Sequence, residues 1–123
     1  MLVISDVIRG YTDTIILAQL REGDSYGYEL NKRIQSITDS EFELKEATLY
    51  TAFRRLEDDA YIISYWGDEN VGARRRYYTI TEKGLELYRE NLQDWDKIKD
   101  MIDSLLKDVC CKGWLSRPLL LQR

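Results

Sequence analysis

The sequence predicts a mainly α-helical fold with one small β-hairpin, and three observations lead to this fold class. Apolar residues recur every three or four positions in four separate stretches, which is typical of amphipathic helices. Between the third and fourth stretches, two runs rich in aromatic and β-branched residues flank a polar turn bounded by Gly67 and Gly72. The fourth stretch is much longer than the others. This order is that of a winged helix-turn-helix followed by one long C-terminal dimerisation helix.

The first two predicted helices cover residues 6–21 and 25–37. The first has an apolar stripe that includes Val7, Tyr11, Ile15 and Ala18. Gly23 suits the left-handed position that ends a helix, and Ser25 is the predicted N-cap of the second helix. The inner face of the second helix consists of Tyr26, Leu30, Ile34 and Ile37. Residues 38–45 form a polar connector in which alternation of Phe42 and Leu44 with charged residues allows a short strand.

The third predicted helix covers residues 46–60. Its buried face is predicted from the apolar positions Leu49, Ala52, Phe53, Leu56 and Ala60. The opposite face then carries polar and charged side chains, namely Thr48, Thr51, Arg54, Arg55 and Asp58. Residues 61–66 and 74–80 are the predicted strands of the hairpin, about six residues in each arm.

The fourth predicted helix runs from residue 82 to residue 109, with Thr81 as its N-cap. Acidic residues outnumber basic residues in it by eight to five, so much of the negative charge lies away from the third helix. We therefore expect a winged helix-turn-helix domain at 1–80, a dimerisation helix at 81–109 and a tail at 110–123. The tail contains the one proline and no acidic residue, and its order is not predicted.

Composition restricts the classes of function. The chain has 123 residues, 22 acidic and 18 basic residues, a net charge of −4 and no histidine. Histidine acid–base catalysis and histidine metal ligands are excluded, and the sequence contains no glycine-rich phosphate loop. We expect no catalytic residues, no metal and no cofactor. An enzyme is the least favoured class.

The cysteines and the hydropathy indicate the compartment. Cys110 and Cys111 are adjacent and are the only two cysteines, which does not make a disulfide framework and suits a reducing cytoplasm. No stretch approaches the roughly 20 apolar residues of a membrane span, and the first residues lack the pattern of a signal peptide. The expectation is a cytoplasmic protein that does not interact with membranes.

The outer face of the third helix predicts DNA binding. An α-helix fits the major groove, where arginine reads guanine and threonine contacts phosphate or a thymine methyl group. The candidate contacts from this helix and its start are Lys45, Thr48, Tyr50, Thr51, Arg54 and Arg55. Taken alone, Arg54 and Arg55 are also consistent with solvated residues paired with the acids at 57–59.

The second candidate is the basic run Arg74, Arg75 and Arg76. In a strand, consecutive side chains alternate faces, so two of these arginines would point one way and one the other. At the tip of a hairpin they would lie along phosphates or enter the minor groove. The alternative is an edge strand protected against pairing by its charge.

Trp95 lies in the middle of the apolar seam of the long helix, where leucine and isoleucine are usual. If this helix crosses its symmetry mate, two indole rings would form a flat slot for a planar apolar ligand. The alternative is an ordinary aromatic residue of a dimer core. Lys99, one turn later, indicates a wet or hollow centre.

These residues resemble the PadR family of bacterial transcriptional regulators. The resemblance is carried by residues 47–62, ATLYTAFRRLEDDAYI, by Arg75-Arg-Tyr-Tyr78, and by Thr81-Glu-Lys-Gly84. It extends over residues 5–108. The family often has glycine where Ala60 stands. The single long C-terminal helix looks like the short PadR subfamily, and the strongest likeness is to its multidrug-binding repressors.

The resemblance implies a homodimer with a flat hydrophobic pore, in which paired Trp95 rings hold a planar aromatic molecule. It also implies that the pore is lined by Val7, Thr14, Ala18, Arg21, Asn91, Leu92 and Lys99. The expected function is repression of transcription through double-stranded DNA carrying an inverted-repeat operator. The rival hypothesis is a helical dimer that binds a protein or small molecule and no DNA. The sequence does not identify the operator, the regulated genes or the effector.

Overall fold

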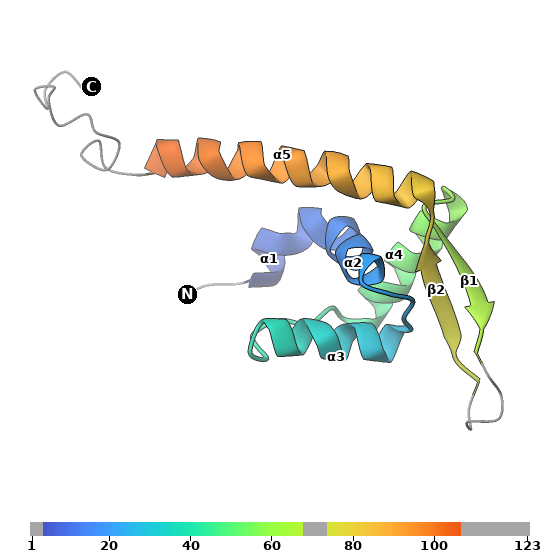
Figure 1. Cartoon of the computed structure of the whole chain (residues 1–123). Helices are drawn as coiled ribbons and strands as arrows, with labels where there is room; N and C mark the ends of the chain where they lie inside the picture. The colour runs from blue at the N-terminus through green and yellow to red at the C-terminus, as the bar shows by residue number, and fades with distance from the viewer. Residues whose placement is uncertain (1–3, 68–73, 107–123) are drawn as a thin grey trace, which may run out of the picture. The chain divides into compact units, whose positions relative to one another are not determined.

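The computed structural model describes residues 4–67 and 74–106, and it confirms the predicted fold class: five helices and one antiparallel hairpin are present in these ranges (Figure 1). No helix in these ranges is both long enough and apolar enough to cross a bilayer. The elements are α1 (Ile4–Ile8), a 3₁₀ turn (Arg9–Tyr11), α2 (Thr12–Arg21), α3 (Gly27–Ile37), α4 (Glu46–Asp58), β1 (Ile62–Trp66), β2 (Arg76–Ile80) and α5 (Glu82–Leu106).

The chain divides into two compact units within α5. The first ends at Arg89 and contains α1–α4, the hairpin and about the first two turns of α5. The second begins at Glu90 and contains the remainder of α5. The domain boundary expected after residue 80 stays a prediction.

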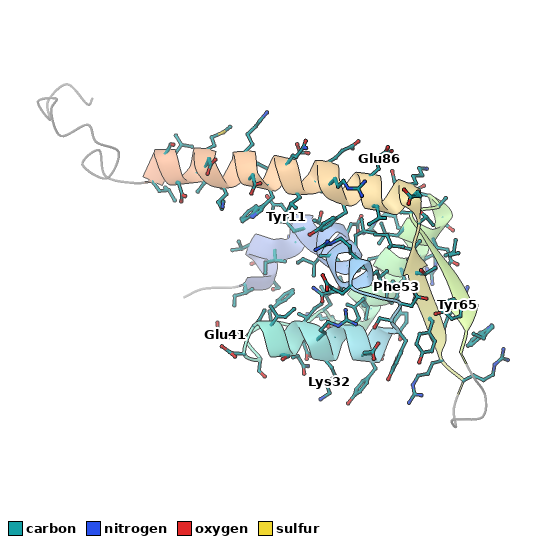
Figure 2. The ribbon with its side chains drawn as sticks, viewed as in Figure 1. Tyr11, Lys32, Glu41, Phe53, Tyr65 and Glu86 are labelled. Atoms are coloured by element: carbon teal, nitrogen blue, oxygen red, sulfur yellow. The ribbon has the colours of Figure 1, made fainter. Side chains whose placement is uncertain are left out.

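The core of the first unit is formed where α2, α3 and α4 meet the hairpin. Phe53 of α4 stacks on Tyr78 of β2, with ring centroids 3.9 Å apart, and Figure 2 shows Phe53 directed from α4 towards this strand. Each fully buried large apolar side chain contributes about 1.5–3 kcal/mol relative to exposure. The buried set consists of Ile16, Leu17, Leu20, Leu30, Ile34, Leu44, Leu49, Ala52, Phe53, Leu56, Ile62 and Tyr78.

The first predicted helix is interrupted. The structure has α1 and α2 separated by the 3₁₀ turn, instead of one helix over residues 6–21. Gly10 lies in this turn, and glycine costs about 1 kcal/mol in a helix interior. The Thr12 hydroxyl donates to the Arg9 carbonyl at 3.2 Å, a local bond that competes with helical pairing. These two residues explain the break.

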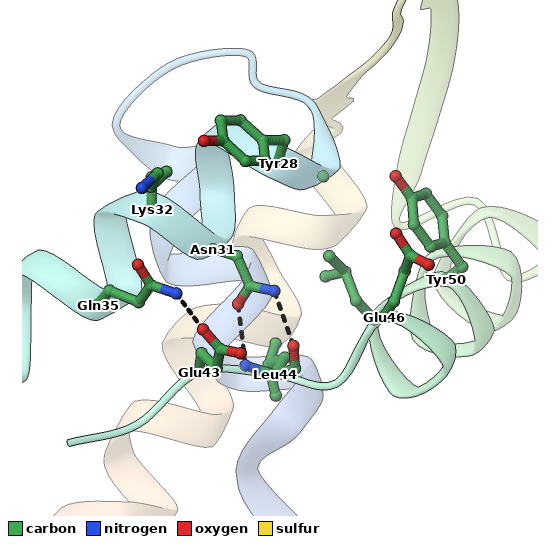
Figure 3. A pocket seen from close by; sticks show the side chains of 10 residues that line it. Tyr28, Asn31, Lys32, Gln35, Glu43, Leu44, Glu46 and Tyr50 are labelled. Carbon is green, nitrogen blue, oxygen red and sulfur yellow. Dashed lines mark hydrogen bonds between the residues drawn. The ribbon is translucent and has the colours of Figure 1, made fainter. Parts of the chain in front are cut away.

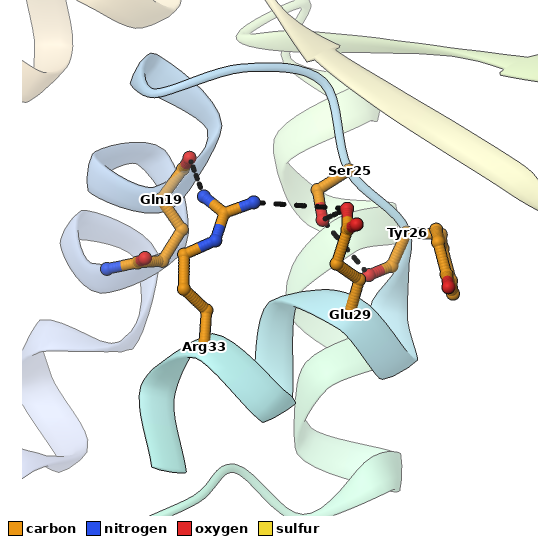
Figure 4. A network of polar contacts seen from close by, with 5 residues as sticks. All are labelled: Gln19, Ser25, Tyr26, Glu29 and Arg33. Carbon is orange, nitrogen blue, oxygen red and sulfur yellow. Dashed lines mark hydrogen bonds and ion pairs between the residues drawn. The ribbon is translucent and has the colours of Figure 1, made fainter. Parts of the chain in front are cut away.

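The prediction that Ser25 caps the second helix was wrong. Tyr26 is the N-cap, and α3 begins at Gly27. Ser25 is fully buried and pairs with Tyr78 of β2 through both backbone bonds, 3.2 and 2.8 Å long. Its hydroxyl donates to Glu29 Oε1 at 2.7 Å (Figure 4). The residue therefore extends the hairpin by one bridge and anchors the start of α3 to it.

The connector between α3 and α4 contains no strand, although alternation had allowed one. The side chain of Asn31 occupies both backbone groups of Leu44, accepting from its N–H at 2.9 Å and donating to its carbonyl at 2.7 Å (Figure 3). Leu44 is therefore buried without a partner strand. These two hydrogen bonds set the position at which α4 begins.

The end of α4 also differs from the prediction. The helix ends at Asp58, and Ala60 is exposed with a φ of +65°, so Ala60 is not part of the buried face. The Tyr61 N–H donates to the Leu56 carbonyl and the Ala60 N–H to the Glu57 carbonyl, at 2.9 and 3.0 Å. These two bonds define a left-handed C-terminal cap that usually contains glycine, so alanine is strained here.

The hairpin has five residues in each arm, one fewer than predicted, and its register pairs Ile62 with Ile80 and Trp66 with Arg76. The return strand begins at Arg76 instead of Arg74. Most of the predicted turn, at residues 68–73, lies outside the described residues.

Helix α5 begins as predicted. The Thr81 hydroxyl accepts a hydrogen bond from the Gly84 N–H at 3.0 Å, which makes Thr81 the N-cap. The predicted last turn at 107–109 and the tail with Cys110 and Cys111 lie outside the described residues. In the second unit, α5 exposes an apolar series, Leu92, Trp95, Ile98, Met101, Ile102, Leu105 and Leu106.

Candidate nucleic-acid interface

Helix α4 presents an outer face that is centred on Thr51 and Arg54. An α-helix turns about 100° per residue, and Leu49, Phe53 and Leu56 point into the core. The residues opposite them are Ala47, Thr51, Arg54 and Asp58, all of which are exposed. Threonine and arginine thus lie at the centre of the surface that a DNA groove would meet.

The flank of α4 nearer α2 carries Thr48 and Arg55. The Arg55 Nε donates to Asp13 Oδ2 at 3.3 Å, and its Nη2 donates to Asp13 Oδ1, which completes a bidentate ion pair. The hydrogen bond to Asp13 raises the pKa of Arg55 above its usual value. Arg55 is therefore held by α2, and not by the nearby acids of its own helix that the sequence suggested as alternative partners.

Lys45 and Thr48 lie together on this same flank. They line a cavity of about 220 Å³ with residues of α1, the 3₁₀ turn and the connector. Both side chains are exposed. The structure thus places these two predicted DNA contacts beside the first helices and separates them from the hairpin.

The other flank of α4 meets the basic run of the hairpin. Tyr50 lines a cavity of about 310 Å³, here called the wing pocket, whose residues are Tyr26, Gly27, Tyr28, Tyr50, Arg74, Arg75 and Arg76. The pocket also lies at the start of α3, where unpaired N–H groups and the helix dipole favour an anion. Predicted site residues from α4 and from the hairpin are brought together here.

Aromatic rings hold the three arginines of the wing pocket. The Arg74 and Arg76 guanidinium carbons lie 4.5 and 5.6 Å from the centre of the Trp66 ring. Arg75 instead lies over Tyr26, at 4.9 Å. Two arginines thus share one ring and the middle one uses another, although Arg74 and Arg75 precede β2.

Two further contacts tie the hairpin to the helices. Arg76 Nη2 lies 3.7 Å from Glu57 Oε2 of α4, so part of its charge is neutralised. On β1, the Tyr65 hydroxyl donates to Asp24 Oδ2 at 2.6 Å, and this bond raises the pKa of Tyr65 to about 12. The hairpin is therefore fixed to α4 on one side and to the α2–α3 loop on the other.

The sequence did not predict that residues of α3 lie beside the candidate interface. Tyr28 is 66% exposed, and Lys32 Nζ lies 5.5 Å from the centre of its ring. Figure 3 shows both residues at a second cavity, of about 300 Å³, beside Tyr50 and the acidic Glu43 and Glu46. The signal in the sequence is Tyr26-Gly-Tyr28 at a helix start, followed by lysine four residues after the second tyrosine.

The positions that the resemblance assigned to a ligand pore divide between the two units. Val7 lies on α1 and is exposed, and Thr14, Ala18 and Arg21 follow one another on α2 at helical spacing. Arg21 lies over the Tyr88 ring at 5.3 Å. The remaining four lie on α5 in the second unit and recur on one face of that helix: Asn91, Leu92, Trp95 and Lys99.

Comparison with known proteins identifies the family. Residues 16–90 match the model of the transcriptional regulator PadR-like family. The chain belongs to this family. The PadR resemblance of its motifs is thereby confirmed, and its DNA-binding fold is that of a transcriptional regulator. No cluster of three or more metal-ligating side chains occurs in the described part of this PadR-like chain.

Several relatives have similar lengths. A transcriptional regulator of Clostridium thermocellum is 51% identical, with a TM-score of 0.77 over 84% of this chain and 100% of that one. A PadR family regulator of Clostridium difficile is 39% identical, with a TM-score of 0.70 over 80% of this chain and 100% of that one. An uncharacterised protein of Lysinibacillus sphaericus is 42% identical over 105 residues, which cover 85% of this chain and 96% of that protein. The PadR similarity thus extends over most of the chain.

Proposed function

We propose that this PadR-type regulator is a repressor that binds an inverted-repeat operator as a homodimer, with α4 of each subunit in the major groove. The supporting observation is that Thr51 and Arg54 lie at the centre of the outer face of α4 while Tyr50 shares the wing pocket with Arg74–Arg76. Arginine and threonine are suited to base edges and phosphates in the major groove. Half-sites one turn apart would place the two helices about 34 Å apart.

The hairpin would follow the phosphates next to the groove. Three arginines, three tyrosines and the N-terminus of α3 surround one cavity, and each of these groups can donate hydrogen bonds to anions. Lys45, Thr48 and Arg55, on the other flank of α4, are proposed to contact the opposite backbone of the same groove. For Arg55, such a contact has to compete with Asp13.

The proposed dimer uses α5. Its second unit exposes leucine, isoleucine, methionine and tryptophan at helical spacing, and a second copy of the helix would cover them. A planar apolar molecule between the paired Trp95 rings would change the angle between the two α5 helices and hence the spacing of the α4 helices. Val7, Thr14, Ala18, Arg21, Asn91, Leu92 and Lys99 are proposed to surround it. Ligand and DNA affinity would then be reciprocally coupled by about 1–3 kcal/mol.

Replacing Arg75 by alanine is expected to weaken binding to all DNA sequences by about tenfold, because a charge-assisted contact to phosphate is lost without loss of a base contact. The measurement is fluorescence anisotropy with the DNA upstream of the protein's own gene and with a scrambled duplex. Arg89→Ala removes an exposed arginine of α5 and serves as the control that should retain wild-type affinity. If the Arg75 variant and the wild type had equal affinity, the proposed role of the β-hairpin in DNA binding would be contradicted.

The same assay separates the proposal from the rival hypothesis, a helical dimer that does not bind DNA. That rival draws on the net charge of −4. A mobility shift of the upstream DNA at physiological salt supports the regulator. Absence of any shift, with a dimer in solution, would favour the rival.

Trp95→Ala is expected to abolish quenching of the intrinsic fluorescence by a planar aromatic dye, because the stacking surface is removed. The measurement is a fluorescence titration of the intact protein. Trp66→Phe should leave the quenching in place, since Trp66 belongs to the wing. Quenching that persists in the Trp95 variant would assign the dye to Trp66 or Trp114 and contradict the proposed ligand site.

A further inference from the structure

Trp66 belongs to the β-hairpin, and none of the functional roles predicted from the sequence involves it. It is the last residue of β1, it lies opposite Arg76 in the hairpin register, and 51% of its surface is exposed. An indole ring in this position is costly to leave in water. Its neighbours are the guanidinium groups of Arg74 and Arg76, at 4.5 and 5.6 Å from the ring centre.

Stacking on an aromatic ring leaves arginine able to bind phosphate. When a guanidinium stacks on a ring, its face lies against the ring, and the ring takes up none of its five in-plane N–H donors. An ion pair uses these N–H groups instead, as the contact between Arg76 and Glu57 partly does. A tryptophan ring can therefore restrict an arginine side chain without itself using the N–H donors.

Restricting an arginine side chain before binding affects affinity, because arginine has many rotamers. A free arginine loses this freedom when it binds, and the loss reduces the affinity that the contact provides. An arginine already held over a ring loses less. Since both Arg74 and Arg76 line the wing pocket, a single ring restricts two of its three arginines.

We propose that Trp66 is a positioning residue for DNA binding, which holds Arg74 and Arg76 at the wing pocket in the arrangement that reaches the phosphate backbone. This inference rests on the proposed DNA-binding function. It assigns Trp66 no base contact and no direct phosphate contact. Its effect on affinity passes through the two arginines alone.

The test is a double-mutant cycle on DNA affinity, measured by anisotropy with the upstream DNA. Trp66→Leu keeps an apolar side chain and removes the aromatic face, whereas Trp66→Phe keeps a smaller aromatic face. We expect Trp66→Leu to weaken binding about three- to tenfold and Trp66→Phe to weaken it less. In the Arg74→Ala/Arg76→Ala background, Trp66→Leu should have no further effect.

Arg75 provides the matched control, because it lies over Tyr26 and not over Trp66. In the Arg75→Ala background, Trp66→Leu should have its full effect. Thermal unfolding of each variant, followed by circular dichroism, shows whether the fold is retained at the assay temperature. If Trp66→Leu proves too unstable, the cycle is carried out with Trp66→Phe.

The outcomes distinguish failure of this inference from failure of the proposed function. Wild-type protein that does not bind the upstream DNA overturns both. Wild-type binding with an effect of Arg75→Ala, combined with no effect of either Trp66 variant, overturns the positioning role alone. A Trp66 effect of full size in the Arg74→Ala/Arg76→Ala background would also overturn it, because the ring would then act independently of these arginines.

Discussion

Replacing Gly84 by alanine is expected to lower the free energy of unfolding by about 1–3 kcal/mol, which is typical of overpacking at a rigid site. A Cβ at this position would lie well inside contact distance of the Tyr61 carbonyl oxygen and 2.8 Å from Ile80 Cγ1. The Tyr61 carbonyl cannot easily move, because it accepts the Thr81 N–H at 3.1 Å and the Thr81 hydroxyl at 3.0 Å. The first turn of α5 would have to shift.

Urea unfolding followed by circular dichroism measures this change, and Gly10→Ala is the matched control. A Cβ at Gly10 has no neighbouring atom within 4 Å, so this variant should match or exceed the stability of the wild type. In an unobstructed helix, alanine is more stable than glycine by about 1 kcal/mol. A stabilised Gly84→Ala protein would therefore contradict the close packing of α5 on the end of α4.

DNA affinity is expected to fall by about 10³-fold between 50 and 200 mM salt, the loss expected for about six phosphate contacts. In the proposed dimer, three of the basic residues Lys45, Arg54, Arg74 and Arg75 in each subunit would account for these contacts. Arg55 and Arg76 are expected to add less, because Asp13 and Glu57 already neutralise part of their charge. Equilibrium titrations at several salt concentrations give the slope of log affinity against log salt.

Arg75→Ala provides the internal control for this slope. Each phosphate contact contributes about 0.9 to it, so a dimer that loses one contact per subunit should have a slope smaller by about two. A wild-type affinity that does not depend on salt would contradict a phosphate-binding wing. An unchanged slope in the variant would show instead that Arg75 does not meet the backbone.

The fold class was predictable because apolar periodicity determines which segments become helices and where they bury their faces. It predicted the core positions Leu49, Phe53 and Leu56, and the N-cap preference of threonine predicted the cap at Thr81. The structure confirms all four. Positions where single residues override this periodicity were not predicted. Thr12 competes with helical pairing, and Ala60 adopts a left-handed backbone conformation that alanine rarely takes.

The candidate site was less predictable, because its charges are set by contacts between residues far apart in the sequence. The pairing of Arg55 with Asp13 spans 42 residues, and local spacing suggested acids on the same helix. Two further contacts likewise depend on how α3 packs: the cation–π contact of Arg75 with Tyr26 and the hydrogen bonds between Asn31 and Leu44. Sequence patterns indicate which arginines are exposed, and the packed fold decides which of them keep their charge available.

Through the ion pair between Asp13 and Arg55, α2 can affect the DNA affinity of the regulator. Asp13 belongs to a helix that supplies none of the proposed DNA contacts, and yet it controls one arginine of α4. A neutral residue at position 13 would release that arginine towards the groove. Operator strength could thus be tuned, by natural variation or by design, without altering any residue that reads a base.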